Sequence, residues 1–168
     1  MNYAQIIKCD AVNGEGLRTS LFVSGCTHHC KGCFNEVAWS FTYGQPFTEK
    51  TLAELLELLA PGHIAGLTIL GGEPMDPRNI GTVLDIVKEV KAKYPEKNIW
   101  IYTGYLYEDL IKRDGVIGKA TRELLIDYVD VLVDGPYIEA LRDPALAFRG
   151  SANQRILRKE PGNDKGNI

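Results

Sequence analysis

Hydrophobic and polar residues follow one another along this chain in short blocks that predict alternating strands and helices. Leu17–Val23 is rich in apolar and β-branched residues and is followed closely by a glycine, which is typical of a strand. The range 3–12 is a weaker strand candidate. Short apolar segments predict further strands at 66–70, 98–103, 129–133 and, near the C-terminus, 154–157.

Between the strands, apolar residues recur with the period of a helix. Thr48 fits a helix N-cap, and the leucines behind it share one helix face until Pro61-Gly62 ends the pattern: Leu52, Leu55, Leu56 and Leu59. Pro77 fits the first turn of a second helix. Its apolar stripe is Ile80, Val83, Leu84 and Val87, and Pro95 ends it. Two further helices are predicted at 106–113 and 119–128.

This alternation predicts an α/β fold of mostly parallel strands joined by crossover helices. A full eight-fold barrel needs about 250 residues, whereas this chain has 168. We therefore expect five or six strands in an incomplete TIM-like barrel or an open curved sheet. One domain should cover 1–157, and the polar residues 158–168 should form a frayed tail.

Ligands of such folds bind at the carboxyl ends of the strands. Four segments directly follow predicted strands and should meet at one rim: the cysteine-rich loop after Val23, Gly71-Gly72, Thr103-Gly104 and Asp134-Gly135.

Composition narrows the possible partners. The net charge of −3 leaves no basic footprint for a nucleic acid or an acidic membrane surface. No apolar run approaches the roughly 18–20 residues that span a bilayer. The first residues lack the basic and apolar regions of a signal peptide, so we expect a cytoplasmic protein.

The strongest chemical signal is Cys26-x3-Cys30-x2-Cys33. Thiolates are soft ligands that suit iron–sulfur clusters, zinc and cuprous ions, and three of them leave one coordination position open. Structural zinc is the main alternative, with His28, His29 or Cys9 as a fourth ligand. It usually needs a second cysteine pair, which this chain lacks, so the spacing favours an iron–sulfur cluster. Cys9 is interpreted as a small buried hydrophobe outside the site.

The cysteine motif, followed by Phe34, resembles the cluster motif of the radical S-adenosylmethionine enzymes. A second motif of that family, of the GGE type, is matched by Gly71-Gly72-Glu73-Pro74 after an apolar strand. Further motifs resemble the glycyl-radical activating enzymes that serve anaerobic ribonucleoside-triphosphate reductase, over residues 3–157. They are Asp10-x2-Asn13-Gly14-x-Gly16, Trp100-x-Tyr102-Thr103-Gly104-Tyr105, Val133-Asp134-Gly135 and Arg149-Gly150-Ser151-x-Asn153-Gln154.

The resemblance implies one 4Fe-4S cluster on Cys26, Cys30 and Cys33, with the fourth iron chelating S-adenosylmethionine. A low-potential donor such as flavodoxin would reduce the cluster. Cleavage of the cosubstrate would give a 5′-deoxyadenosyl radical, which takes a hydrogen atom from the glycine loop of the reductase large subunit.

For the cosubstrate, the resemblance implies binding by Gly32, Cys33, Phe34, Gly71 and Gly72, with a core role as the alternative for Phe34. No side chain is expected to be a catalytic nucleophile or general base. The roles of several other residues stay open: Arg18, Glu73, Asp134, Arg149 and Asn153.

Three other functions are alternatives: activation of a different glycyl radical enzyme, radical chemistry on a small molecule, or a zinc-bearing interaction module. Because so short a chain has too few strands to close a barrel, we expect its open side to receive the partner.

Overall fold

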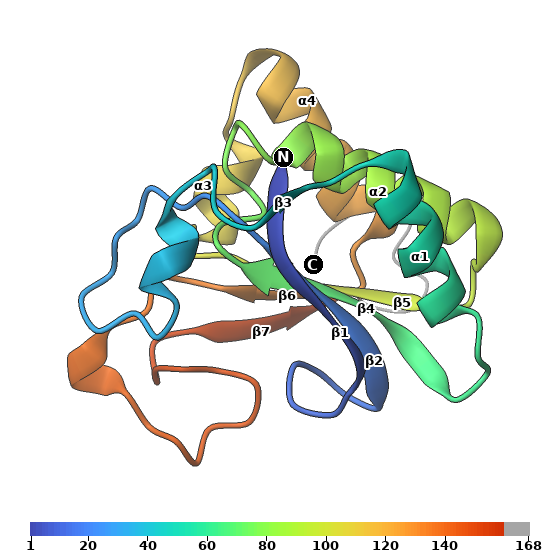
Figure 1. The fold of residues 1–168 in the computed structure, drawn as a ribbon. Coiled ribbons are helices and arrows are strands. Elements are labelled where there is room, and N and C mark those ends of the chain that lie inside the picture. The colour runs from blue at the N-terminus through green and yellow to red at the C-terminus, as the bar shows by residue number, and fades with distance from the viewer. Residues whose placement is uncertain (160–168) are drawn as a thin grey trace.

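The computed structural model describes residues 1–159. They form one seven-stranded sheet in the order β3-β1-β2-β4-β5-β6-β7 (Figure 1). The central strands β2, β4, β5 and β6 are parallel, and the outer strands β1, β3 and β7 run antiparallel to their neighbours. Their bounds are β1 (Asn2–Asp10), β2 (Leu17–Val23), β3 (Gln45–Pro46), β4 (Ile64–Gly71), β5 (Asn98–Tyr102), β6 (Val131–Asp134) and β7 (Arg155–Arg158).

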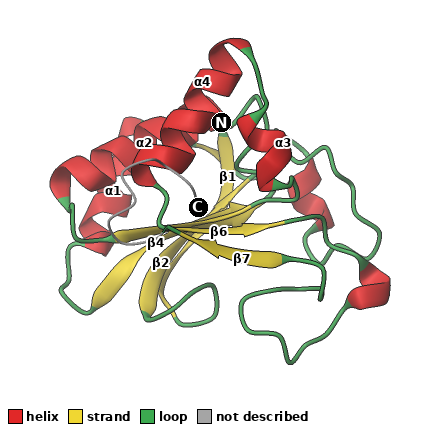
Figure 2. Ribbon diagram, turned by 180° about the vertical axis from the view of Figure 1, so that it is seen from behind, coloured by secondary structure: helices red, strands yellow, loops and turns green. Residues whose placement is uncertain are grey.

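Helices connect the parallel strands, and they stand together on one face of the sheet (Figure 2). Thr48 caps the first of them, because its side chain accepts from the Thr51 amide in a reciprocal capping box. The α-helices are α1 (Glu49–Leu59), α2 (Ile80–Lys93), α3 (Tyr107–Ile111) and α4 (Gly115–Glu123). Three short helical segments are also present in the described residues: the 3-10 helices η1 (Glu36–Trp39) and η3 (Glu139–Leu141) and the π-helix η2 (Leu124–Tyr128).

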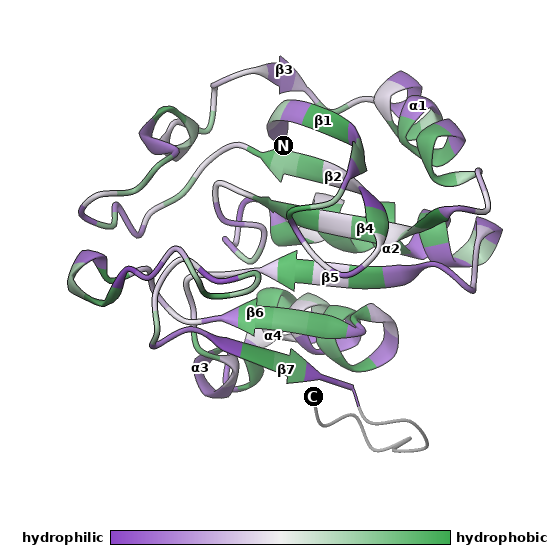
Figure 3. Cartoon of the chain, turned by 90° about the horizontal axis from the view of Figure 1, so that it is seen from below, coloured by the Kyte–Doolittle hydropathy of each residue, from purple (hydrophilic) through white to green (hydrophobic). Residues whose placement is uncertain are grey.

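Alternation along the central strands divides the sheet into two different faces. Residues such as Leu21, Ile69 and Ile101 pack with the helices in one fully buried core. The opposite face, seen from below in Figure 3, is not covered by these helices. There the loop of residues 11–16 folds over the strands, and its Asn13 carbonyl accepts from Thr68 Oγ1 at 2.8 Å.

The α/β class is confirmed, and the expected number of strands is corrected. The sheet has seven strands rather than five or six, because the two-residue β3 carries no sequence signal. The sheet is open, which is one of the two expected arrangements, because β3 and β7 lie at its two ends and do not pair with each other. Strand β1 is antiparallel because the short loop 11–16 leaves no room for a crossover helix before β2.

Smaller differences occur at element ends. The helix predicted at 119–128 starts at Gly115 and finishes as a π-helix. Strand β7 runs past residue 157 to Arg158, and the Lys159 amide bonds to the Asp130 carbonyl at 3.0 Å. The rest of the tail prediction, residues 160–168, lies outside the described residues. Within residues 1–159, no helix is long and apolar enough to cross a membrane.

The prediction that Cys9 is buried is wrong. Cys9 is exposed and has a φ of +55°, where the pairing of β1 with β2 shifts register before Asp10. A shift of this kind turns a side chain out of its expected alternation. Cys9 remains outside the cysteine loop, as expected.

Candidate cluster and cofactor site

A cavity of about 340 Å³ lies where the parallel strands end, a size within the usual range for small-molecule sites. All four segments that were expected at one rim contribute to its wall. The lining includes Cys26, Cys30 and Cys33 after β2, Gly71-Gly72-Glu73 after β4, Thr103-Gly104 after β5, and Gly135 after β6.

The three cysteines of this wall are free thiols of intermediate exposure. A turn in which the Cys33 amide donates to the Cys30 carbonyl at 3.1 Å sets the last two close together. Backbone amides also approach the sulfur atoms: those of His28 and His29 bond to Cys26, and that of Asn35 lies 3.4 Å from Cys33 Sγ. Such amide donors stabilise the negative charge of cluster-bound thiolates.

Burial raises the pKa of the Cys26 thiol to about 11, and the nearby amides only partly offset this effect. Burial also raises the pKa of Cys30. Both thiols therefore keep their protons at neutral pH until a metal displaces them. Three thiols on one wall, with amide donors around the sulfurs, fit the three cysteine ligands of a 4Fe-4S cluster.

The two glycines of the GGE turn pack against the base of the cysteine loop. The Gly72 amide donates to the Val23 carbonyl and the Glu73 amide to the Gly25 carbonyl, both at 2.8 Å. A Cβ at position 72 would lie 2.6 Å from the Gly25 oxygen, while Gly71 has a φ of +107°. The turn thus needs glycine to fit against the segment that carries Cys26, in addition to any approach of a ligand.

Glu73, whose role the sequence left open, is almost completely buried at 1% exposure. It therefore does not face solvent. Its Oε1 accepts from the Met75 amide at 2.9 Å and from Thr103 Oγ1 at 2.8 Å. Its Oε2 accepts from the Gly104 amide at 2.8 Å and lies 3.0 Å from His28 Nε2. This carboxylate therefore joins the ends of β4 and β5 to the cysteine loop.

Both histidines of the loop already contact other side chains. The His28 ring contacts Glu73 and meets Tyr105 edge-on, with ring centroids 4.4 Å apart. The His29 ring stacks on Trp39 at 4.6 Å. The positions of the two rings favour a cluster over the zinc site that would recruit them.

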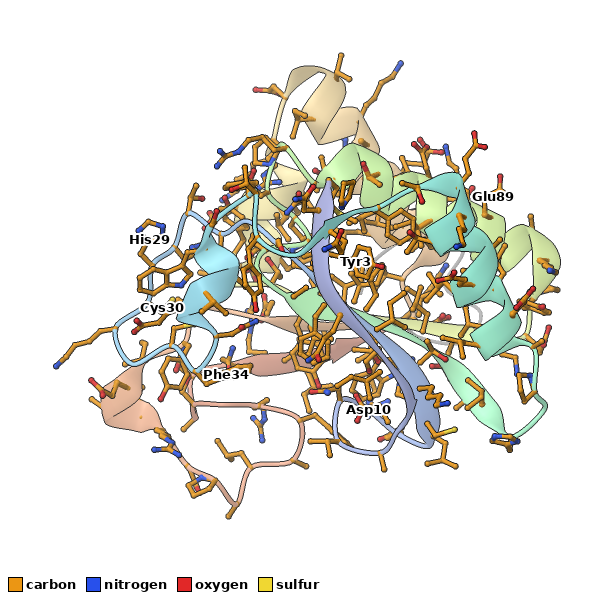
Figure 4. The ribbon with its side chains drawn as sticks, in the orientation of Figure 1. Tyr3, Asp10, His29, Cys30, Phe34 and Glu89 are labelled. Atoms are coloured by element: carbon orange, nitrogen blue, oxygen red, sulfur yellow. The ribbon has the colours of Figure 1, made fainter. Side chains whose placement is uncertain are left out.

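Phe34 and Gly32 lie on either side of Cys33 in different settings. Phe34 borders the cavity but is 88% exposed, so its alternative as a core residue is wrong. Figure 4 shows Phe34 on the same loop as His29 and Cys30. Gly32 has a φ of +73° and packs against the side chain of Glu139, which a Cβ would approach to 2.8 Å. It does not itself line the cavity.

Arg18 is fully buried on the sheet face that carries the loop 11–16. Its donors go to Thr68 Oγ1, Asn98 Oδ1 and backbone carbonyls. Desolvation lowers the pKa of its guanidinium to about 10. These long-range bonds tie β2 to β4 and β5.

The remaining open residues hold the loops beyond β6. Asp134 is fully buried and accepts from the Tyr107 amide and from the guanidinium of Arg155. Asn153 Nδ2 donates to the Pro136 carbonyl at 2.7 Å. Arg149 donates to the Gln154 carbonyl at 3.2 Å and is the one of these three that borders the cavity.

Comparison with known proteins agrees with this geometry. A family model described as a 4Fe-4S single cluster domain matches residues 12–157. A relative from Pasteurella multocida is 47% identical over 160 residues, which cover 94% of this chain and 98% of the relative. Relatives from Haemophilus influenzae and Enterobacteria phage T4 are 44% identical over 160 residues and 43% identical over 162 residues. They cover 94% and 96% of this chain and 98% and 97% of the relatives, respectively. All three are named anaerobic ribonucleoside-triphosphate reductase-activating protein.

Proposed function

The chain belongs to the family of anaerobic ribonucleoside-triphosphate reductase-activating proteins, and we propose from this premise that it generates the glycyl radical of its reductase. The observation that carries the proposal is the set of three free thiols on one wall of an open cavity at the strand ends. Three cysteine ligands leave one iron of a 4Fe-4S cluster free to bind a cosubstrate.

In this proposal Cys26, Cys30 and Cys33 hold the cluster. When bound, the cluster supplies one electron for cleavage of S-adenosylmethionine to methionine and a 5′-deoxyadenosyl radical, which takes a hydrogen atom from a glycine of the reductase. The amides that approach Cys26 and Cys33 stabilise the charge on the thiolates. No side chain needs to act as a nucleophile or general base.

The cosubstrate lies along the strand ends. The carbonyls of Gly71 and Gly72 meet its methionine ammonium group, and Cys33 with Phe34 forms the wall beside the adenosine. Gly32, which does not line the cavity, contributes by allowing the turn that places Cys33. Because Phe34 is 88% exposed, its ring is free to close over a bound nucleoside. An aromatic ring offers a stacking face to a base.

The partner is the glycine loop of the reductase large subunit, which enters through the open mouth of the cavity. A low-potential donor such as flavodoxin supplies the electron, in the cytoplasm. The four parallel strands with their crossover helices correspond, in this proposal, to the incomplete barrel of radical S-adenosylmethionine enzymes.

Anaerobic reconstitution tests the proposal. The wild-type protein should become brown, hold about four irons per chain, release 5′-deoxyadenosine under a strong reductant, and produce a glycyl-radical EPR signal when mixed with the reductase. Cys30→Ala serves as the inactive control. A colourless zinc protein, or one that leaves S-adenosylmethionine uncleaved, would contradict the proposal.

A further inference from the structure

Two polar residues of the cavity wall have no part in the chemistry described so far. His28 lies in the cysteine loop between Cys26 and Cys30, and Glu73 directly follows Gly71-Gly72. Both line the cavity, and His28 Nε2 lies 3.0 Å from Glu73 Oε2. These residues are far apart in sequence, so their contact joins the segment that carries the sulfur ligands to the turn proposed to bind the cosubstrate.

The carboxylate of Glu73 is fully occupied by the protein. A carboxylate has about four lone-pair sites, and Glu73 has four partners: the Met75 and Gly104 amides, Thr103 Oγ1 and His28 Nε2. With 1% exposure, it presents no free oxygen to a ligand in this arrangement. Its contribution to the cosubstrate site must therefore come through the groups that it holds in place.

The His28 ring is fixed by packing as well as by this bond. It meets Tyr105 edge-on at an interplanar angle of 64°, and only 20% of its side chain is exposed. It also lies directly over Gly104, where a Cβ would come within 2.7 Å of His28 Cδ2. The ring thus rests on the β5 end, whose Gly104 amide and Thr103 hydroxyl bind the same carboxylate.

We propose that His28 is a positioning residue that orients Glu73 and thereby sets the cysteine loop at a fixed distance from the Gly71-Gly72 turn. The inference rests on the proposed function, because the geometry that it fixes is the spacing between the cluster and the methionine end of the cosubstrate. Loss of the His28–Glu73 bond should weaken cosubstrate binding while the three cysteines still hold their cluster.

The test compares three variants of the anaerobically reconstituted protein. His28→Phe keeps a ring against Tyr105 but removes the donor. His28→Gln restores a donor at a similar reach from the backbone. His63→Phe is the control, since it makes the same ring change at an exposed histidine outside the cavity lining. Each protein is assayed for iron content and for the EPR spectrum of its reduced cluster during titration with S-adenosylmethionine.

For His28→Phe we expect the wild-type iron content and the wild-type spectrum without cosubstrate. The concentration of S-adenosylmethionine that changes the spectrum should rise about tenfold or more, as for other losses of an outer hydrogen bond at a metal site. His28→Gln should recover most of this loss, and His63→Phe should titrate like the wild type.

Three results would overturn the inference. One is a His28→Phe variant that titrates like the wild type. Another is a His28→Phe variant that loses iron, because His28 would then be needed only for the folding of the cysteine loop. The third is a His28→Gln variant that is as weak as His28→Phe. If the wild type itself neither binds nor cleaves S-adenosylmethionine, the proposed function fails, and this inference fails with it. That result is distinguishable, because it appears without any substitution.

Discussion

At the scale of single residues, Gly72 illustrates how closely two backbone segments pack around the cluster site. The glycine pair was expected to admit a ligand, so a side chain there would have affected the cosubstrate alone. The structure adds a second requirement, because a Cβ at this position would lie 2.6 Å from the Gly25 oxygen, next to Cys26. A substitution therefore pushes on the cysteine loop itself.

We expect Gly72→Ala to destabilise the protein by about 1–3 kcal/mol, the usual cost of overpacking, and to lower iron retention as well as cosubstrate affinity. Thermal melting and iron analysis measure the two effects. Gly81→Ala is the matched control, because nothing lies within 4 Å of a Cβ at that helical position. A Gly72→Ala variant with normal iron content and melting temperature would show that the loop can move away without cost.

The cysteine assignment gives a second prediction. Cys30→Ser should abolish the cluster, because two remaining thiolates cannot retain three irons. Cys9→Ser should keep the cluster, since Cys9 is exposed and does not line the cavity. Iron content and visible absorbance after anaerobic reconstitution distinguish the two. Retention of the cluster by Cys30→Ser, or its loss in Cys9→Ser, would contradict the assignment of the cluster ligands.

The spacing of three cysteines in one loop is a local pattern, so the sequence alone was enough to find them. The His28–Glu73 contact could not be found in this way. Its two residues are 45 positions apart, and Arg18 reaches Asn98 across 80 positions. His28 and Arg18 each have several plausible partners in the sequence, and only the packing of the folded chain decides among them.

At the scale of elements, periodicity located the central strands and most helices, because the apolar residues of each segment recur with the period of its buried face. The direction of the outer strands depends instead on the connections. Strand β7 follows a stretch without a crossover helix, and it pairs antiparallel with β6. Arg155 at its start donates to Asp134 at the end of β6 and, bidentately, to Glu108 of α3 at 2.8 and 2.9 Å.

This arrangement predicts a specific acid sensitivity. Hydrogen bonds from Arg155 lower the pKa of Glu108 from 4.5 to about 2. The bond therefore stabilises the fold above pH 4.5 and loses its effect as the pH falls from there towards 2. Because Glu108 is exposed, the effect should be small.

Melting of wild type and Glu108→Gln side by side between pH 7 and pH 2.5 tests this sign, since acid damage to a cluster affects both equally. The wild type should melt higher at pH 7, and the difference should shrink steadily as the pH falls below 4.5. A difference that grows on acidification would contradict the assignment.

At the scale of the whole molecule, the two faces of the sheet have separate tasks. The helices bury one face completely, so that face has no room for a ligand. The other face and the strand ends carry loops, and the cavity mouth includes Val12 at 74% exposure and Phe34 at 88% exposure. Chain length was enough to predict that the sheet does not close into a barrel. The way in which the loops 11–16 and 142–154 fold over the sheet depends on long-range contacts, which the sequence does not show.

The cavity mouth exposes apolar side chains, whereas the sheet face under the helices is buried. We therefore expect the reductase to dock at the cavity mouth. Hydrogen exchange of the reconstituted protein should slow about tenfold or more on complex formation in three segments: 11–16, 30–35 and 142–150. The N-terminal turn of α4 is the internal control, because Val116 is 83% exposed yet lies outside the cavity lining. Its exchange should stay unchanged. The contrary result is slower exchange on α4 and unchanged exchange at the cavity mouth, in a complex that still forms the glycyl radical. It would show that the reductase does not dock at the open side.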